Sequence, residues 1–142
     1  MEKRKIRIAL ITVLAIPTII LGFRLLADPV DLVELSLNKH QIDQSDELVL
    51  SIRNLGFQRV SFGTSYRIYK VFSDGTTEEV EFPPNYAFSL LEIWLAPLFG
   101  SYQQDVYTGH LKIGVYLVEK EITIGEITYS KSVKFFVLLA HA

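Results

Sequence analysis

The sequence contains no cysteine among its 142 residues. This excludes a disulfide framework, a lipid-modified cysteine and a cysteine nucleophile, so the folded chain has to be stabilised by packing. Histidine is also scarce: His40, His110 and His141 lie far apart, and none has a second ligand at a spacing that suits a metal ion. We therefore expect these histidines to be surface or loop residues.

Motifs that carry catalytic chemistry are missing as well. There is no Gly-x-Ser-x-Gly and no phosphate-binding glycine loop. The acids near Asp74, which are Glu78, Glu79 and Glu81, lack the spacing of a Ca²⁺ loop and are expected to form a solvated hairpin face. The sequence predicts no enzyme, no cofactor and no metal site.

Basic residues are fewer than acidic residues after residue 27. From residue 28 onward the chain has nine Lys or Arg residues against fifteen Asp or Glu residues, a formal charge of −6. Such an acidic surface argues against nucleic acid as a partner. It also argues against electrostatic attraction to anionic lipid.

A long run without charged residues occurs only near the N-terminus, over residues 8–23. With residues 24–27 it reaches about 20 residues, or roughly 30 Å as a helix, which spans a bilayer core. Basic residues precede it, and the positive-inside rule then places the N-terminus in the cytoplasm and the C-terminal part outside. The basic residues are Lys3, Arg4, Lys5 and Arg7.

The chain is therefore divided into a basic head with a transmembrane signal-anchor helix at 1–27 and an extracytoplasmic domain at 28–142. Cleavage of the anchor remains an alternative, because Ala27 suits position −1 of a signal-peptidase site, although Leu25 fits position −3 poorly. A buried core helix would show polar residues at a spacing of 3.6, and residues 8–23 do not.

The exported domain alternates between apolar and polar residues with a period of two, which is typical of strands. Asp74-Gly75 predicts a hairpin turn. The acids of residues 76–82 predict an edge strand. About seven short strands indicate an all-β sandwich or barrel, and they are expected at 33–37, 48–53, 65–72, 76–82, 103–108, 114–122 and 127–139.

Residues 83–100 break this pattern, because they are apolar, aromatic and bounded by prolines. One interpretation is a long crossover that packs over one end of the sandwich. The other is a partly exposed patch that contacts a protein partner or the bilayer surface. The candidate contact residues are Phe88, Leu91, Trp94, Leu95 and Phe99.

A local pattern adds a family resemblance. Leu111, Gly114 and Tyr116 form Leu-x-x-Gly-x-Tyr, which is similar to the tyrosine corner of Ig-type Greek-key sandwiches. Together with the alternating strand at 48–54, it resembles bacterial and archaeal Ig-like domains of exported or membrane-anchored proteins over about residues 31–138. The resemblance implies an Ig-like Greek-key β-sandwich that binds or acts as a spacer, with no catalytic residues. It implies that glycine at 114 gives the backbone freedom for a tight approach.

Three functional hypotheses follow. The first is a single-pass protein of the cell membrane, anchored through residues 8–27, whose Ig-like domain binds or supports another envelope protein. The second is a structural subunit of a surface filament or layer, assembled by exchange of the strand at 133–139. The third is an inhibitor of an extracytoplasmic hydrolase. The sequence leaves the oligomeric state open.

Overall fold

The computed structural model describes residues 28–140. The predicted membrane span at 8–27 lies outside these residues. Within residues 28–140 the one helical element is the 3-10 turn η1 (Pro29–Leu32). No helix of this described part is long and apolar enough to cross a membrane.

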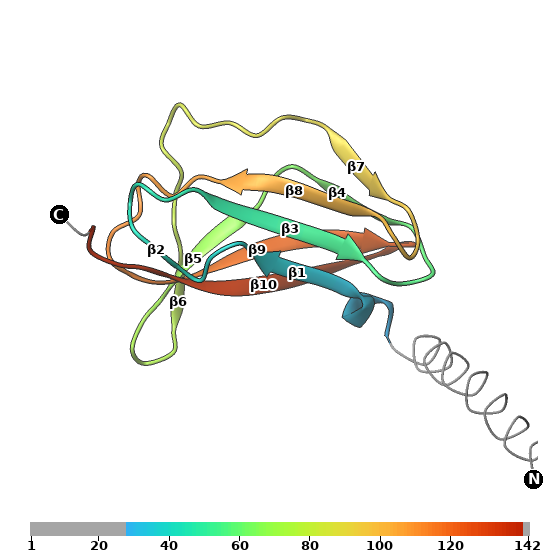
Figure 1. Cartoon of the computed structure of the whole chain (residues 1–142), viewed down its shortest axis with the longest axis horizontal. Coiled ribbons are helices and arrows are strands. Elements are labelled where there is room, and N and C mark those ends of the chain that lie inside the picture. Colours follow the sequence, from blue (N-terminus) through green and yellow to red (C-terminus); the bar gives the residue numbers. More distant parts are fainter. Residues whose placement is uncertain (1–27, 141–142) are drawn as a thin grey trace, which may run out of the picture.

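The domain is built from two sheets (Figure 1). The smaller sheet is antiparallel, in the order β1-β3-β8, with bounds Val33–Leu37, Leu48–Asn54 and Ser101–Val106. The larger sheet has the order β2-β10-β9-β4-β7, with β5 paired to β9 and β6 paired to β5. Its strands are β2 (Gln41–Ile42), β4 (Val60–Gly63), β5 (Arg67–Val71), β6 (Thr77–Glu79), β7 (Glu92–Leu95), β9 (Gly114–Ile124) and β10 (Ile127–Val137).

The all-β sandwich expected from the sequence is confirmed, but it has ten strands where about seven were expected. The three additional strands are β2, β4 and β7, which are two to four residues long. Such short segments contain too few residues to show a period of two. β2 and β4 form because the long strands β10 and β9 offer them backbone partners, and β7 then pairs with β4.

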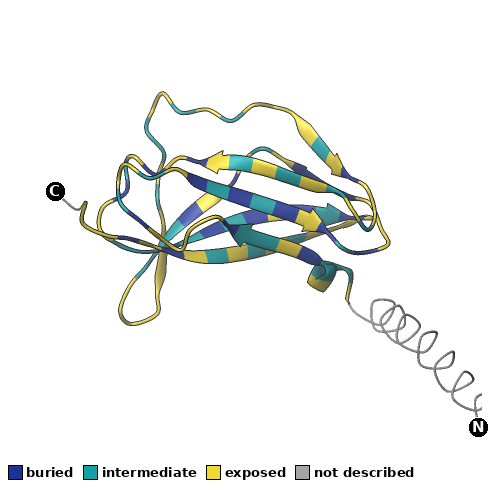
Figure 2. Cartoon of the chain, in the orientation of Figure 1, coloured by how far each residue is buried: buried dark blue, intermediate teal, exposed yellow. Residues whose placement is uncertain are grey.

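Alternation places the core between the sheets (Figure 2). In β3, Leu48, Leu50 and Ile52 are buried, and the residues between them are half-buried or exposed. The hairpin of β9 and β10 aligns eleven residue pairs and turns at Gly125, whose φ of 64° suits glycine. Phe135, fully buried, packs its ring 5.6 Å from that of Tyr116.

Tyr116 also ties β9 to the loop before it. Its hydroxyl donates a hydrogen bond of 2.7 Å to the carbonyl of Lys112, and Leu111 beside it is buried. This is the contact that the Leu-x-x-Gly-x-Tyr pattern predicts. Gly114 does not provide a close approach, because an added Cβ would lie 3.5 Å from Tyr116 Cε2, an ordinary van der Waals distance.

A buried lysine binds the backbone at an interruption in the larger sheet. β4 pairs with β9 at residues 60–61 and β5 pairs with it at residues 67–71, so the chain between them leaves the ladder. Lys120 of β9 is fully buried opposite this break. Its Nζ donates to the carbonyls of Gly63 and Ser65 at 2.6 and 2.8 Å.

The third bond of Lys120 reaches the other sheet. Its Nζ donates to Gln104 Oε1 of β8 at 2.9 Å, and Gln104 Nε2 donates to the carbonyl of Thr64 at 2.9 Å. The ammonium also lies 5.1 Å from the centre of the Phe62 ring. These partners are neutral, and burial lowers the pKa of Lys120 to about 8.

Replacing Tyr116 with phenylalanine should lower the free energy of unfolding by about 1 kcal/mol, because the Lys112 carbonyl loses its donor. Urea denaturation followed by circular dichroism measures the change. Tyr129→Phe is the matched control, because the Tyr129 hydroxyl makes no hydrogen bond within residues 28–140. Equal midpoints for the two variants would contradict a stabilising role for the hydroxyl.

The buried ammonium of Lys120 predicts a pH-dependent stability. Between pH 8 and about 10.5 the unfolded chain holds this proton and the folded chain does not, so the free energy of unfolding should rise with pH. Below pH 8 the buried ammonium lowers the free energy of unfolding by its full amount, and this loss disappears as the pH rises across the interval. Lys120→Met has no proton to lose there, and its curve should not show this rise. Parallel curves for the two proteins, measured by denaturant unfolding at each pH, would show that Lys120 does not titrate in the fold.

Candidate functional site

The stretch before β7 is fixed by an aromatic cluster. The Tyr66 ring lies 5.5 Å from that of Phe82 and 4.9 Å from that of Phe88, and Phe82 and Tyr86 stack at 4.9 Å. The Tyr66 hydroxyl accepts the Tyr107 N–H at 2.7 Å, and burial raises the pKa of Tyr66. Phe88 therefore packs against the core, and the segment arches over the sandwich from β6 to β7 (Figure 1).

β7 then lies antiparallel to β4, with Leu95 opposite Val60 and Trp94 opposite Ser61. Alternation along the strand turns Ile93 and Leu95 inward. Leu95 is only 4% exposed and belongs to the core. The prediction that Leu95 contacts a partner is wrong, because the register with β4 directs its side chain between the sheets.

Three apolar side chains on or just before β7 are exposed, and we call them the β7 edge: Leu90 and Leu91, which precede the strand, and Trp94, which faces outward from it. Leu90 is fully exposed, and Leu91 and Trp94 are 64% and 56% exposed. Within residues 28–140, β7 pairs with β4 alone, so its other side is open. Leu91 and Trp94 were predicted contacts; Leu90 was missed, although it stands next to Leu91 in the same apolar run.

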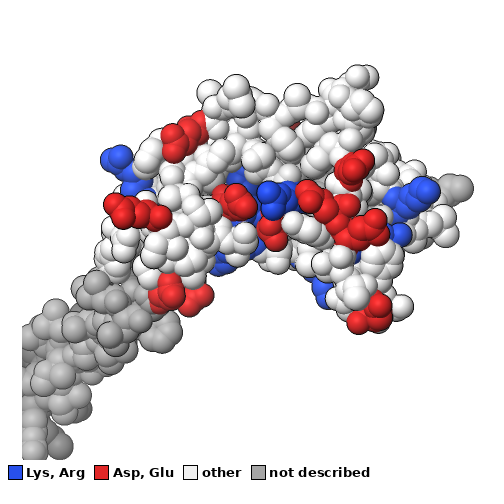
Figure 3. Space-filling model, turned by 180° about the vertical axis from the view of Figure 1, so that it is seen from behind, with Lys and Arg blue, Asp and Glu red and all other residues white. Residues whose placement is uncertain are grey.

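Two charged side chains flank the β7 edge. Glu92, the first residue of β7, is exposed between Leu91 and Trp94. The guanidinium of Arg59 lies 5.4 Å from the centre of the Trp94 ring, close enough for a cation–π contact. Seen from behind, most charged side chains lie across the middle and lower part of the domain, and one acid stands at its upper left margin (Figure 3). A surface of this kind suits a protein partner better than a charged ligand.

Phe99, the last predicted contact, lies beyond β7 on the turn that leads to β8. It is 90% exposed. Gly100 closes this turn with an N–H bond of 3.1 Å to the Ala96 carbonyl, and an added Cβ at Gly100 would come within 2.6 Å of Ala96. Leu98 has a φ of 71°, so the turn is tight and holds Phe99 in solvent.

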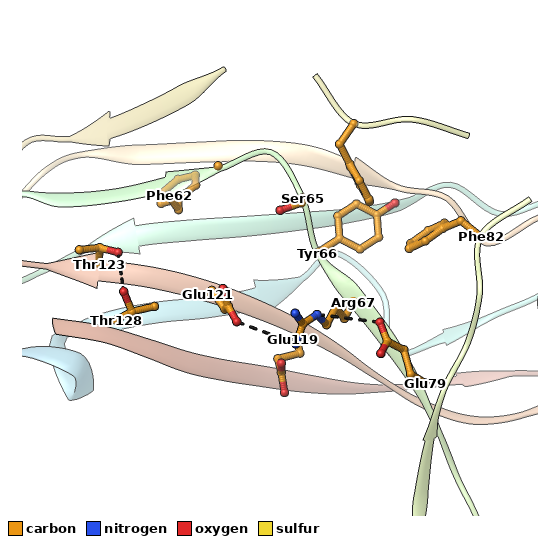
Figure 4. A pocket seen from close by; sticks show the side chains of 12 residues that line it. Phe62, Ser65, Tyr66, Arg67, Glu79, Phe82, Glu119, Glu121, Thr123 and Thr128 are labelled. Atoms are coloured by element: carbon orange, nitrogen blue, oxygen red, sulfur yellow. Dashed lines mark hydrogen bonds and ion pairs between the residues drawn. The ribbon is translucent and has the colours of Figure 1, made fainter. Parts of the chain in front are cut away.

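A second feature is a hollow over β5 and β9 (Figure 4). Arg67 lies there between Glu79 and Glu121, with an N–O distance of 3.9 Å to each. The three side chains are more than half exposed, so these ion pairs contribute little to stability. The described residues contain no group of three or more His, Cys, Asp or Glu side chains placed to hold a metal ion.

His110 is the described histidine with an unusual setting. Its ring stacks on Tyr107 at 5.2 Å and lies 5.5 Å from the Phe82 ring. Both ring nitrogens are buried without a hydrogen-bond partner in the described part of the chain, and burial lowers the pKa of His110. The neutral ring therefore packs as one more member of the aromatic cluster.

The structure resembles several solved proteins. One is the ASH or PapD-like domain 7 of human CEP192, with 14% identity and a TM-score of 0.41 over 82% of this chain and 90% of that one. Another is the Pseudomonas fluorescens alkylpurine DNA glycosylase AlkC bound to DNA with an abasic site analog, with 17% identity and a TM-score of 0.38 over 75% of this chain and 30% of that one. A third is the structural genomics target SoR45, with 15% identity and a TM-score of 0.37 over 72% and 82% of the two chains.

Comparison with curated proteins gives no match. A family model described as a bacterial Ig-like domain matches residues 31–135, which include every strand except the last two residues of β10. The match agrees with the two-sheet architecture and with the resemblance found in the sequence. The chain belongs to the bacterial Ig-like domain family.

Proposed function

We propose that the protein is a non-catalytic Ig-like module, held at the extracytoplasmic side of the cell membrane by residues 8–27, that binds another envelope protein through the β7 edge. The observation that carries the proposal is the exposed apolar group of the β7 edge, on and just before an open strand. Burying a large apolar side chain such as Leu91 or Trp94 contributes about 1.5–3 kcal/mol. Trp is also among the residues that dominate binding interfaces.

The backbone of β7 supports the same mode of binding. An open strand edge can add an extended segment of a partner, with backbone bonds for affinity and side-chain contacts for specificity. β6, another edge strand, is blunted by the charges of Glu78 and Glu79. β7 carries one exposed acid, Glu92, and neither Lys nor Pro, and Trp94 presents an apolar side chain beside its open backbone.

The membrane anchor is inferred from the sequence. Residues 8–23 carry no charge and follow four basic residues, as expected of a signal anchor with a cytoplasmic N-terminus. Asp28 accepts the N–H of Val30 at 3.3 Å and caps η1, so the folded domain starts directly after the predicted span. This leaves no spacer between anchor and domain.

Strand exchange at the C-terminus is less well supported. β10 pairs with β9 over its full length of eleven residues, and its last two residues also pair with β2. Donating residues 133–139 to a neighbour would break this ladder and expose Phe135, which is fully buried. The structure thus favours the anchored binding module over the filament subunit, and it offers no feature that favours a hydrolase inhibitor.

Site-specific photo-cross-linking tests the β7 edge. A photoreactive amino acid at Leu91 of the full chain in its native membrane should yield one discrete adduct, because the partner covers this side chain. The same group at Asp74, in the exposed β5–β6 hairpin, should yield none. Adding Leu90→Ser and Trp94→Ser should lower the yield at Leu91 at least tenfold, as expected when two anchors worth about 1.5 kcal/mol or more each are lost.

The mass of the adduct separates the hypotheses. A heterologous mass supports a separate partner protein. A ladder in multiples of 16.2 kDa would contradict the proposal and support the structural subunit. Equal labelling at Leu91 and Asp74 would show that the β7 edge is not a specific contact. Since Leu90 and Trp94 are exposed, the two serines should leave thermal unfolding nearly unchanged.

The anchor has its own test. The wild-type chain should remain in the membrane pellet after alkaline carbonate extraction. Leu14→Arg with Ile19→Arg places two charges near the centre of the span at about 2.5–3.5 kcal/mol each, which offsets the apolar contribution, and should prevent membrane insertion. Ile113→Arg with Leu139→Arg adds equal charge at exposed positions of the domain and should not. Recovery of the wild-type chain in the soluble fraction would contradict the anchor.

A further inference from the structure

Exposed apolar residues lie at both ends of the sandwich, and Phe72, Ile113 and Leu139 are at the end away from η1. Three others lie at the end where the folded domain begins. They are Phe57, Phe99 and Ile127, which are 39%, 90% and 57% exposed. Each stands on a different connection: Phe57 between β3 and β4, Phe99 between β7 and β8, and Ile127 at the first position of β10. None of the three belongs to the core cluster.

Backbone contacts show that these connections share one end with η1. Leu55 donates its N–H to the carbonyl of Leu32 in η1 at 2.9 Å, which joins the β3–β4 connection to the domain's first turn. Leu98 donates its N–H to the carbonyl of Gly56 at 2.8 Å, which joins the β7–β8 turn to the same connection.

The β9–β10 turn lies at this end as well. Ile124, just before the turn, pairs with Val60, just after the β3–β4 connection. In Figure 1 the ends of β3, β7 and β9 and the starts of β1 and β10 all lie on the side where η1 lies. We call this side the N-terminal end of the domain.

We propose that the N-terminal end of the domain rests on the outer surface of the lipid bilayer, with Phe57, Phe99 and Ile127 inserted into its interfacial layer. The inference rests on the membrane anchor of the proposed function. Beyond anchoring, the domain itself contacts the lipid and does not rotate freely relative to the membrane. The β7 edge, on the flank of the sandwich, then stays accessible to a partner beside the anchor.

The length of the connection brings this end to the lipid. The predicted span ends at residue 27, and Asp28 already caps η1. The polar layer on each side of a bilayer core is about 6 Å thick. An end of the domain joined to the span without a spacer is held at the level of the headgroups, where aromatic rings are favoured.

Charge at this end decides the kind of lipid contact. Asp28, Asp31 and Glu126 are exposed acids. Of the bases, Arg59 is engaged with Trp94, and Lys131 donates to carbonyls of η1 and the start of β1. This mixture gives no basic surface that would attract anionic lipid. The contact is therefore apolar, and it should form on neutral phosphatidylcholine. The acids remain in the hydrated headgroup layer, where carboxylates keep their water.

The turn that carries Phe99 is suited to insertion. Gly100 and the positive φ of Leu98 fix the backbone of residues 96–100, so Phe99 is already displayed before it meets the membrane. Exposing a Phe to this extent is costly in water and favourable at an interface. A preformed turn loses little conformational entropy on docking.

Fluorescence quenching by lipid provides the test. The chain has no cysteine, so Gln58→Cys introduces a single label site beside Phe57, and Asp74→Cys places a control label on the β5–β6 hairpin at the other end (Figure 1). Each full-length protein carries an environment-sensitive fluorophore in phosphatidylcholine vesicles. Spin-labelled phosphatidylcholine should quench the label at position 58 at least about twofold more than the label at position 74, because its nitroxide acts only at short range.

Serine variants connect the quenching to the apolar residues. Phe57→Ser with Phe99→Ser, in the chain labelled at position 58, should lower the quenching to the level at position 74. Phe72→Ser is the matched control, because Phe72 is as exposed as Phe57 but lies on the β5–β6 hairpin. It should leave the quenching at position 58 unchanged. Should the double variant fail to fold, the labels on the otherwise unchanged sequence still decide the question.

Flotation of the same vesicles separates this inference from the anchor. Chains that float but show equal quenching at both labels would overturn the docking and leave the anchor standing. Chains that do not float would overturn the proposed function itself. Protection at position 58 that grows with the protein-to-lipid ratio, without lipid quenching, would overturn the docking in favour of a second copy of the chain covering this end.

Discussion

The fold depends on the buried side chain of Lys120, which binds the backbone where the larger sheet is interrupted between β4 and β5. The Lys120 ammonium satisfies the carbonyls of Gly63 and Ser65, which have left the ladder, and it binds Gln104 of the opposite sheet. A buried unpaired carbonyl is costly, and so is a buried charge, but each removes part of the cost of the other. One side chain thus fixes both the course of the chain through the break and the distance between the sheets.

The position of the candidate site follows from that interaction. β4 ends at Gly63, whose carbonyl Lys120 holds, and β7 pairs with β4. β7 can lie at the margin of the sheet because the acidic hairpin strand β6 pairs with β5, on the other side of the break. Trp94 of β7 is exposed at this margin, because no strand of residues 28–140 pairs with the other side of β7.

Several features were accessible from the sequence. The strands β1, β3, β9 and β10 show alternation over five residues or more, and glycine marks the tight turns at Gly75 and Gly125. The short strands were not accessible, since a four-residue strand such as β7 takes its register from β4. For the same reason the sequence could not separate Trp94 from Leu95, which the register with β4 turns to opposite faces of the strand.

By itself the sequence determined the class of fold, the acidic and cysteine-free character of the domain, and the apolar run that precedes it, because these depend on composition and local periodicity. The tertiary structure alone decided which apolar residues of 83–100 are core and which are surface. It also decided that Phe57, Phe99 and Ile127 share one end with η1, and that a lysine lies inside the sandwich. These outcomes depend on contacts between residues far apart in the chain, which no local pattern contains.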